Sequence, residues 1–167
     1  MRLTYHVFII FFAITFVSCG GGEKKKEKIK IQAKETKSTI DTNVAKLVIS
    51  GNDMMKFDKN ELRVKAGQKV KLTLRHTGKI DVNVMGHNVV ILNTGVDVNA
   101  FAAKAAVSKA TDYIPQDALS EIVAYTGLIG GGQITSIEFD APSTGTYDFI
   151  CSFPGHVALM KGKFIVE

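Results

Sequence analysis

The chain has 167 residues, of which 46% are hydrophobic and 22% charged, which favours a folded domain and excludes a wholly disordered chain. Its two cysteines, Cys19 and Cys151, exclude a disulfide-rich scaffold. The net charge of +5 lies mostly before residue 44, because residues 44–167 hold 13 Lys and Arg against 12 Asp and Glu. The sequence therefore predicts a near-neutral domain without a nucleic-acid-binding face.

The first 18 residues have the pattern of a signal peptide. Arg2 precedes an apolar run at 7–17, which is too short for a permanent membrane-spanning helix. Residues 16–19, FVSC, resemble a bacterial lipobox, which implies cleavage before Cys19 and lipidation of its sulfur. An ordinary secretory signal or an uncleaved anchor is the alternative.

Residues 19–43 are expected to be a flexible tether that starts at the lipidated cysteine. They are rich in Gly and then in Lys and Glu, with too few apolar residues to form a core. A short amphipathic helix is the alternative. The excess of lysine suggests attraction to anionic lipid headgroups. We therefore expect a lipoprotein on a bacterial membrane, facing the periplasm or the cell surface.

Residues 44–167 are predicted to form one domain of short strands. The clearest is 69–76, KVKLTLRH, in which apolar and polar residues alternate as in a strand with one buried face. Gly and Pro separate the strands. The predicted strands are 45–50, 62–65, 69–76, 89–92, 134–139, 147–151 and 163–166.

One segment interrupts this pattern with helical character. Residues 97–110 are rich in alanine, and Asp97 or Asn99 could cap the helix at its N-terminus. A second helical turn is possible within 116–124. Short, regularly spaced strands with one helical insertion around 97–124 predict an all-β fold, a Greek-key sandwich of antiparallel strands.

A cluster of potential metal ligands lies near the C-terminus. Cys151, His156 and Met160 are spaced five and four residues apart, and His87 precedes another strand. Two imidazoles, a thiolate and a weak thioether form the ligand set of a blue-copper centre, and the Gly86 carbonyl could approach the metal opposite the thioether. Taken singly, each side chain is more often structural. A zinc site or a Cys–His nucleophile pair is also conceivable.

Two segments, VMGHNVVIL (84–92) and CSFPGHVALMKG (151–162), resemble azurins, a family of bacterial cupredoxins. GNDMMKF, GLIGGG and SIEFD also look azurin-like, so the resemblance covers nearly all of 45–167. It implies a cupredoxin fold and one type 1 copper per chain. The implied ligands are His87, Cys151 and His156, with Met160 axial and the Gly86 carbonyl opposite.

The resemblance also implies roles around the copper. Asn88 would hold the two ligand loops together, the backbone N–H of Phe153 would point at the thiolate, and His76 would be structural or pH-sensing. The electron would leave through an exposed edge of His156. An apolar docking patch would surround that edge, formed by Met55, Val84, Met85, Phe153, Pro154, Ala158 and Leu159.

Three features depart from the family pattern. Ala45 and Gln68 stand where the family usually has two disulfide-bonded cysteines. The stability of about 2–4 kcal/mol that such a bridge typically contributes is therefore in doubt. Val89 replaces a buried tryptophan, and Tyr125 replaces a surface histidine.

These features predict a membrane-tethered carrier of single electrons and not an enzyme. Copper oxidases and nitrite reductases need further histidines, whereas residues 44–167 contain three. The expected partners are redox proteins such as a cytochrome c, a terminal oxidase or a peroxidase, and the expected state is a monomer. The alternative is a copper buffer, chaperone or resistance protein without electron transfer.

Overall fold

The computed structural model describes residues 43–167. The predicted signal peptide, the lipidation of Cys19 and the tether fall on residues 1–42 and lie outside the described residues.

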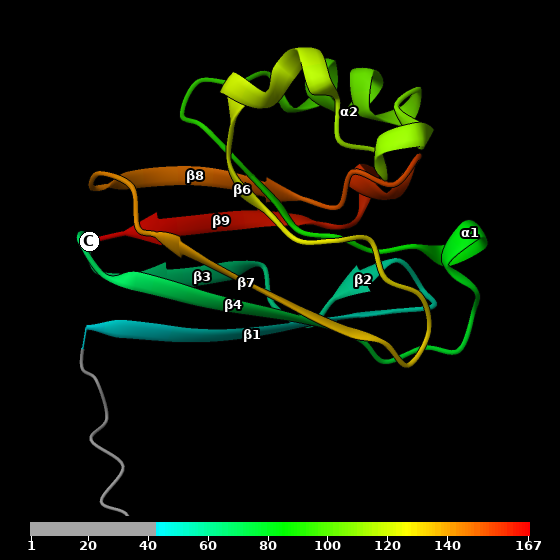
Figure 1. Cartoon of the computed structure of the whole chain (residues 1–167), viewed down its shortest axis with the longest axis horizontal. Helices are drawn as coiled ribbons and strands as arrows, with labels where there is room; N and C mark the ends of the chain where they lie inside the picture. Colours follow the sequence, from blue (N-terminus) through cyan, green and yellow to red (C-terminus); the bar gives the residue numbers. More distant parts are fainter. Residues whose placement is uncertain (1–42) are drawn as a thin grey trace, which may run out of the picture. The chain divides into compact units, whose positions relative to one another are not determined.

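The described residues form two sheets packed face to face (Figure 1). The four-stranded sheet has the order β2-β1-β4-β7, formed by Lys56–Phe57, Val44–Asn52, Lys69–His76 and Ile134–Asp140. The five-stranded sheet has the order β3-β9-β8-β5-β6, formed by Glu61–Val64, Lys161–Val166, Gly145–Ile150, Val90–Leu92 and Ile122–Tyr125. The predicted all-β sandwich is confirmed.

The prediction that the strands are antiparallel is wrong for two pairs. β1 runs parallel to β4, and β3 runs parallel to β9. For β1 and β4, the reason lies in the path of the chain. After β1 the chain crosses to the other sheet to form β3, and it then returns to the first sheet as β4, in the same direction as β1. Hydrophobic alternation reports which face is buried and carries no information on strand direction.

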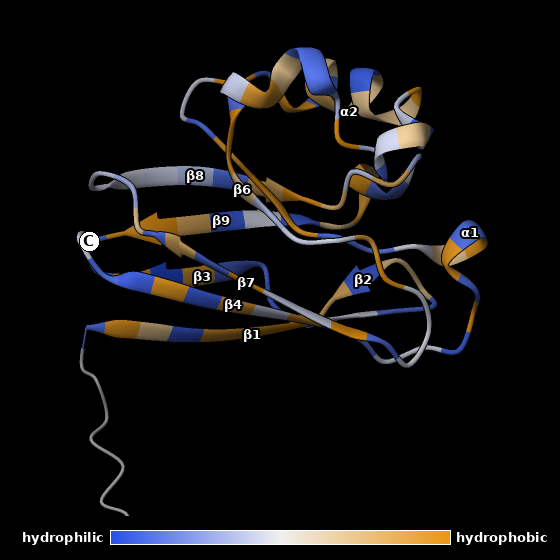
Figure 2. Cartoon of the chain, viewed as in Figure 1, coloured by the Kyte–Doolittle hydropathy of each residue, from blue (hydrophilic) through white to orange (hydrophobic). Residues whose placement is uncertain are grey.

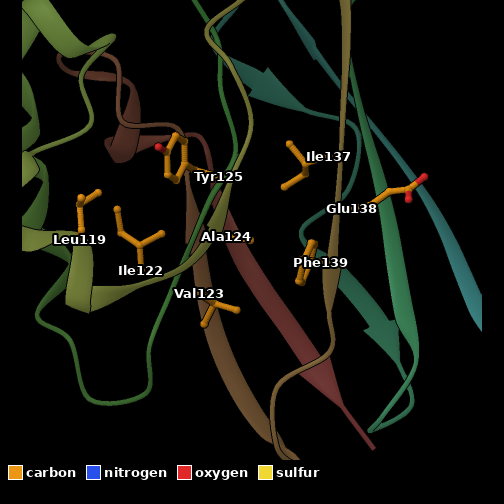
Figure 3. A pocket seen from close by; sticks show the side chains of 8 residues that line it. All are labelled: Leu119, Ile122, Val123, Ala124, Tyr125, Ile137, Glu138 and Phe139. Atoms are coloured by element: carbon orange, nitrogen blue, oxygen red, sulfur yellow. The ribbon is translucent and has the colours of Figure 1, made fainter.

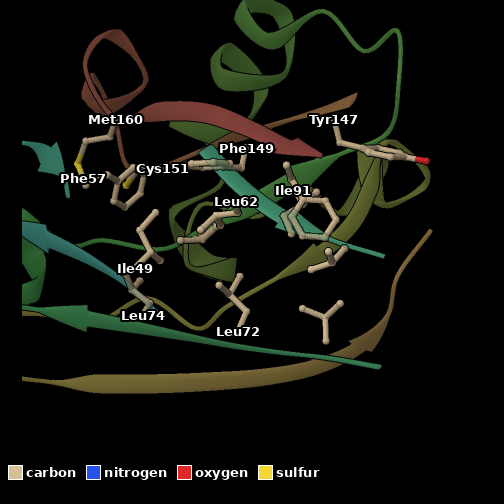
Figure 4. Packing of buried hydrophobic residues seen from close by; sticks show 14 of the residues in the cluster. Ile49, Phe57, Leu62, Leu72, Leu74, Ile91, Tyr147, Phe149, Cys151 and Met160 are labelled. Atoms are coloured by element: carbon tan, nitrogen blue, oxygen red, sulfur yellow. The ribbon is translucent and has the colours of Figure 1, made fainter. Parts of the chain in front are cut away.

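The alternation in β4 positions the main core between the sheets. Val70, Leu72 and Leu74 are fully buried, and Figure 2 shows the polar residues of β4 alternating with them. Leu72 is in register with Leu47 of β1 and with Ile137 of β7. Cys151 and Met160 lie together at one end of this core (Figure 4). Two of the candidate ligands are thus part of the main core.

The helical insertion forms a second, smaller core against the five-stranded sheet. Phe101 and Ala105 of α2 (Val98–Ala106) pack with Ile114 and with residues of β5 and β8. The predicted cap is confirmed, since the Asp97 carboxylate accepts hydrogen bonds from the N–H groups of Asn99 and Ala100 at 2.9 and 3.1 Å.

Several element boundaries differ from the predictions. The helix ends at Ala106, and after Ser108 the chain forms a 3₁₀ turn, η1 (Lys109–Thr111). The second predicted turn is the 3₁₀ segment η2 (Gln116–Glu121), after which the apolar run IVAY forms strand β6. Short apolar runs do not distinguish a strand from a helical turn, which explains the error. Strand β2 and the short helix α1 (Val82–Met85) were not predicted.

Within residues 43–167, no helix is both long and apolar enough to cross a membrane.

At the positions of the missing disulfide, Ala45 packs against the main core, and the Gln68 side chain accepts a hydrogen bond from the Lys65 N–H at 2.9 Å. Both positions therefore have ordinary noncovalent contacts.

Candidate metal centre

Two loops at one end of the sandwich bring the predicted ligands together. His87 lies between α1 and β5, Cys151 directly follows β8, and His156 begins the 3₁₀ turn η3 (His156–Ala158). The potential ligand atoms of these three residues lie within 4.8 Å of one another, and all three residues are buried. Among residues 43–167 this is the one cluster of three or more His, Cys, Asp or Glu side chains with metal-binding spacing.

The remaining two predicted ligands border this cluster. The Cys151 Sγ lies 3.6 Å from the Nδ1 of His156 and 3.8 Å from the carbonyl oxygen of Gly86. Met160 is fully buried. A Cβ atom built on Gly51 would lie 2.7 Å from the His87 ring and 3.1 Å from the Met160 methyl, so the thioether approaches the same ring. The structure thus gathers all five predicted ligands in one place.

The surroundings of His87 favour a cation at this site. Its Nε2 lies 2.9 Å from the Asn52 carbonyl oxygen, and its Nδ1 lies 2.9 Å from the Gly86 carbonyl oxygen. A neutral imidazole carries one N–H and cannot donate to both oxygens. Burial lowers the pKa of His87, which disfavours the doubly protonated ring. A metal ion bound to Nδ1 removes the conflict between Nδ1 and the Gly86 oxygen, so these residues fit a bound metal.

His76 packs against the ring of His87. The two rings stack with centroids 4.3 Å apart and an interplanar angle of 8°. The Nδ1 of His76 accepts from the Gly78 N–H at 3.1 Å, and its Nε2 donates to the Met85 carbonyl at 2.8 Å. Both nitrogens are therefore occupied, and His76 is not a candidate ligand.

The protonation states of the other two ligands follow from burial. Burial raises the pKa of the Cys151 thiol to about 11, and hydrogen bonds from the N–H groups of Asn88 and Phe153 lower it in part. Burial also lowers the pKa of His156 to about 4, with smaller contributions from the charges of His87 and His76. His156 is therefore neutral at physiological pH and free to bind a metal, whereas the thiol must lose its proton.

Two buried hydrogen bonds join the loops that carry His87 and Cys151. The Asn88 Nδ2 donates to the Ser152 Oγ at 2.8 Å, and the Ser152 N–H donates to the Asn88 Oδ1 at 2.8 Å. Asn88 thus holds the position expected of it. Sequence reasoning missed Ser152, Asn52 and Gly51, although Asn52 and Gly51 lie within the azurin-like segment GNDMMKF.

The loop from Cys151 to Met160 is closed by its own backbone. The Cys151 N–H donates to the Met160 carbonyl at 2.9 Å, and the Met160 N–H donates to the His156 carbonyl at 2.7 Å. Gly155 adopts φ = 81°, a conformation that glycine tolerates and other residues rarely adopt. The loop can therefore turn His156 back toward Cys151.

The residues of the predicted docking patch differ in exposure. Val84 and Leu159 are each 63% exposed, and Pro154 and Ala158 are also exposed. His156 is only 3% exposed, so its accessible edge is smaller than expected. The remaining members are half-buried or buried, namely Met55, Met85 and Phe153. Met54, which is 74% exposed, was not predicted and neighbours Met55 in sequence.

A separate hollow of about 390 Å³ lies between β6 and β7, at an open edge of the sandwich (Figure 3). Its lining is mainly apolar, and its one charged residue, Glu138, forms an ion pair with Lys71 at 3.3 Å. Because it contains none of the clustered ligands, it is not the candidate metal site.

Comparisons with known proteins agree with this geometry. Residues 43–167 match the family described as copper binding proteins, plastocyanin/azurin family. The chain is 40% identical to azurin-1 of Alcaligenes xylosoxydans xylosoxydans over 118 residues, which cover 68% of this chain and 91% of the relative. It is also 40% identical to outer membrane protein H.8 of Neisseria gonorrhoeae over 119 residues, which cover 69% of this chain and 63% of the relative.

Solved structures show the same fold. Dithionite-reduced auracyanin from the photosynthetic bacterium Roseiflexus castenholzii superimposes with a TM-score of 0.65 at 33% sequence identity. The match covers 74% of this chain and 97% of that structure.

Proposed function

Since the chain belongs to the plastocyanin/azurin family of copper-binding proteins and is a cupredoxin-type blue copper protein, we propose that it carries single electrons between redox partners. The observation that supports this best is the buried cluster of His87, Cys151 and His156, with their ligand atoms within 4.8 Å of one another. Bound copper supplies a one-electron couple that this mixed nitrogen and sulfur set accommodates in both oxidation states.

We propose specific roles for the five residues around the metal. His87, through Nδ1, Cys151, through Sγ, and His156, through Nδ1, would supply the three strong ligands. Met160 and the Gly86 carbonyl, which border the cluster, would supply weaker donors. The Nε2–H of His87 fixes its tautomer by donating to the Asn52 carbonyl, which leaves Nδ1 for the metal.

The protein's contribution to electron transfer would be rigidity. Three ligands lie on a loop closed by its own backbone hydrogen bonds, and the Asn88–Ser152 pair ties this loop to the one that carries His87. Held in this way, the donors would move little when an electron arrives or leaves. Small rearrangement favours fast electron transfer, because little structural energy is added to the barrier.

The electron would leave through His156 and the apolar surface around it. Exposed Val84, Pro154 and Leu159 offer a nonpolar docking surface, and apolar patches of this kind usually mark interaction sites. A partner with a matching apolar face would suit it, such as a cytochrome c, a terminal oxidase or a peroxidase.

We also propose attachment to an export-facing membrane through a lipid on Cys19, on the strength of the lipobox-like sequence. A relative whose name is outer membrane protein H.8 supports a membrane location. Replacement of Cys19 by alanine should release the protein into the soluble fraction. Continued membrane association would contradict the lipid anchor.

Electron exchange distinguishes a carrier from a copper buffer. The copper-loaded protein should give a reversible one-electron wave in voltammetry and should reduce a c-type cytochrome in stopped-flow mixing. Leu159→Glu should slow that reaction several-fold without changing the copper spectrum. A matched control is Val107→Glu, since Val107 is 85% exposed and lies on the helical insertion. Copper binding without reversible redox would favour the buffer or chaperone function.

A further inference from the structure

Tyr113 lies outside the metal site, but its ring packs against the loop that carries three of the proposed ligands. It is 8% exposed, and it belongs to the main core although it lies in the helical insertion. Its ring meets Phe153 edge to face, with centroids 5.0 Å apart and an angle of 66°. This is a favourable arrangement for two aromatic rings.

Phe153 in turn contacts several groups around the metal site. Its ring lies 4.6 Å from the His156 ring, centroid to centroid. It also covers Gly86, since a Cβ atom built there would lie 2.9 Å from the Phe153 ring. The backbone N–H of Phe153 is directed at the Cys151 thiol. A displacement of Phe153 would therefore disturb His156, Gly86 and Cys151 together.

The backbone that presents Tyr113 is unusual. Asp112 and Tyr113 both have positive φ angles, 54° and 63°. Non-glycine residues seldom adopt this conformation, and a bulky residue such as tyrosine adopts it less readily than aspartate. Such conformations persist where surrounding contacts enforce them, and they are concentrated at functional sites. Here the Tyr113 N–H donates to the Ser108 carbonyl at 3.0 Å, which fixes the turn.

The residue after Tyr113 lies in a core that also touches the ligand loop. Ile114 is buried in the smaller core, against which Val157, the residue after His156, also packs. Tyr113 thus contacts the ligand loop at Phe153, before His156, and Ile114 belongs to the core against which Val157, after His156, packs. A cavity of about 330 Å³, partly lined by Tyr113, lies beside this contact and offers space into which a displaced ring could move.

We propose that Tyr113 is a positioning residue for the copper site: it holds Phe153 against His156 and keeps solvent from the ligand loop. The inference rests on the proposed electron-carrier function for its significance, but the contact itself can be tested without copper. Aromatic pairs of this geometry bias an equilibrium by about two- to tenfold. Loss of the ring should therefore increase opening of the loop by a factor in that range.

The test compares Tyr113→Leu with Tyr113→Phe in the full-length protein. In the copper-free form, hydrogen exchange at the Phe153 and His156 amides should accelerate two- to tenfold in Tyr113→Leu and remain near wild type in Tyr113→Phe. In the copper-loaded form, Tyr113→Leu should release copper to a chelator faster by a similar factor. Its reduction potential should fall, because water at the site stabilises the more highly charged Cu(II).

The matched control is Tyr147→Leu, at a buried tyrosine that packs on Phe164 with ring centroids 6.3 Å apart. This variant should lose stability without changing exchange at Phe153 and His156 or the potential. The proposal is overturned if Tyr113→Leu and Tyr147→Leu behave alike, or if Tyr113→Phe fails to preserve the wild-type values. If hydrogen exchange in the copper-free variants changes as expected but neither wild type nor any variant shows a reversible copper couple, the carrier function is contradicted. The positioning role of Tyr113 would still be supported by the exchange data.

Discussion

Replacement of Asn88 by alanine should separate the two ligand loops. The wild-type side chain makes two hydrogen bonds of 2.8 Å with Ser152, and both residues are almost fully buried. Each bond contributes about 1 kcal/mol, and the Ser152 N–H left without its acceptor costs about 1–3 kcal/mol more. The expected loss is therefore about 3–5 kcal/mol in the free energy of unfolding.

Urea unfolding of the copper-free protein measures this loss without interference from metal binding. Asn93→Ala is the matched control, because Asn93 donates one exposed hydrogen bond to the Ser120 carbonyl at 2.8 Å. The control should lose about 1 kcal/mol or less. Asn88→Ala should also release copper to a chelator faster than wild type, since the His87 and Cys151 loops are no longer joined.

Equal losses of stability in Asn88→Ala and Asn93→Ala would refute the reasoning. So would an unchanged rate of copper release, because the Asn88–Ser152 pair would then not restrain the ligand loops.

Three further predictions concern the ligands. Gly51→Ala should cost about 1–3 kcal/mol of stability and alter the copper EPR spectrum, because the new Cβ would lie 2.7 Å from the His87 ring; Gly127→Ala, with its nearest neighbour at 3.8 Å, should do neither. The folded-state pKa of His156 of about 4 lies below the ordinary 6.5, so the unfolded chain takes up the proton first. The copper-free protein should therefore lose up to about 3 kcal/mol between pH 6.5 and 4, and an identical pH profile in His156→Gln would contradict this. Copper binding at pH 8 should release about one proton from Cys151, whose pKa is about 11. Calorimetry in two buffers with different heats of ionisation measures this proton release, and equal binding heats in both buffers would contradict it.

Local sequence patterns predicted much of the fold. The alternation in 69–76 predicted β4 with the bounds that it has, because one face of that strand is buried and the other is wet. The same alternation said nothing of direction, so the parallel pairing of β1 with β4 could not be predicted from it. Element ends were also poorly determined, since α2 packs against the five-stranded sheet and β6 pairs with β5 within it, and both are contacts between distant segments.

The candidate ligands were predictable because their residue types are rare and chemically specific. One cysteine in residues 44–167, with a histidine and a methionine at fixed spacing, suffices to suggest a copper site. The residues that orient the ligands were harder to find. Asn52 acts through its backbone carbonyl, and Tyr113 acts through a ring contact between segments 40 residues apart. Neither role follows from the residue type alone, although Asn52 lies within the azurin-like segment GNDMMKF.

The most direct test of the central claim is a visible and EPR titration of the protein with one equivalent of Cu(II), beside the Cys151→Ser variant. A blue-copper centre built from His87, Cys151 and His156 predicts an intense thiolate-to-copper band with narrow copper hyperfine splitting. Reduction should abolish the band, reoxidation should restore it, and Cys151→Ser should lack it. A folded wild-type protein that stays colourless, or whose Cys151 is oxidised by the added copper, would contradict the claim.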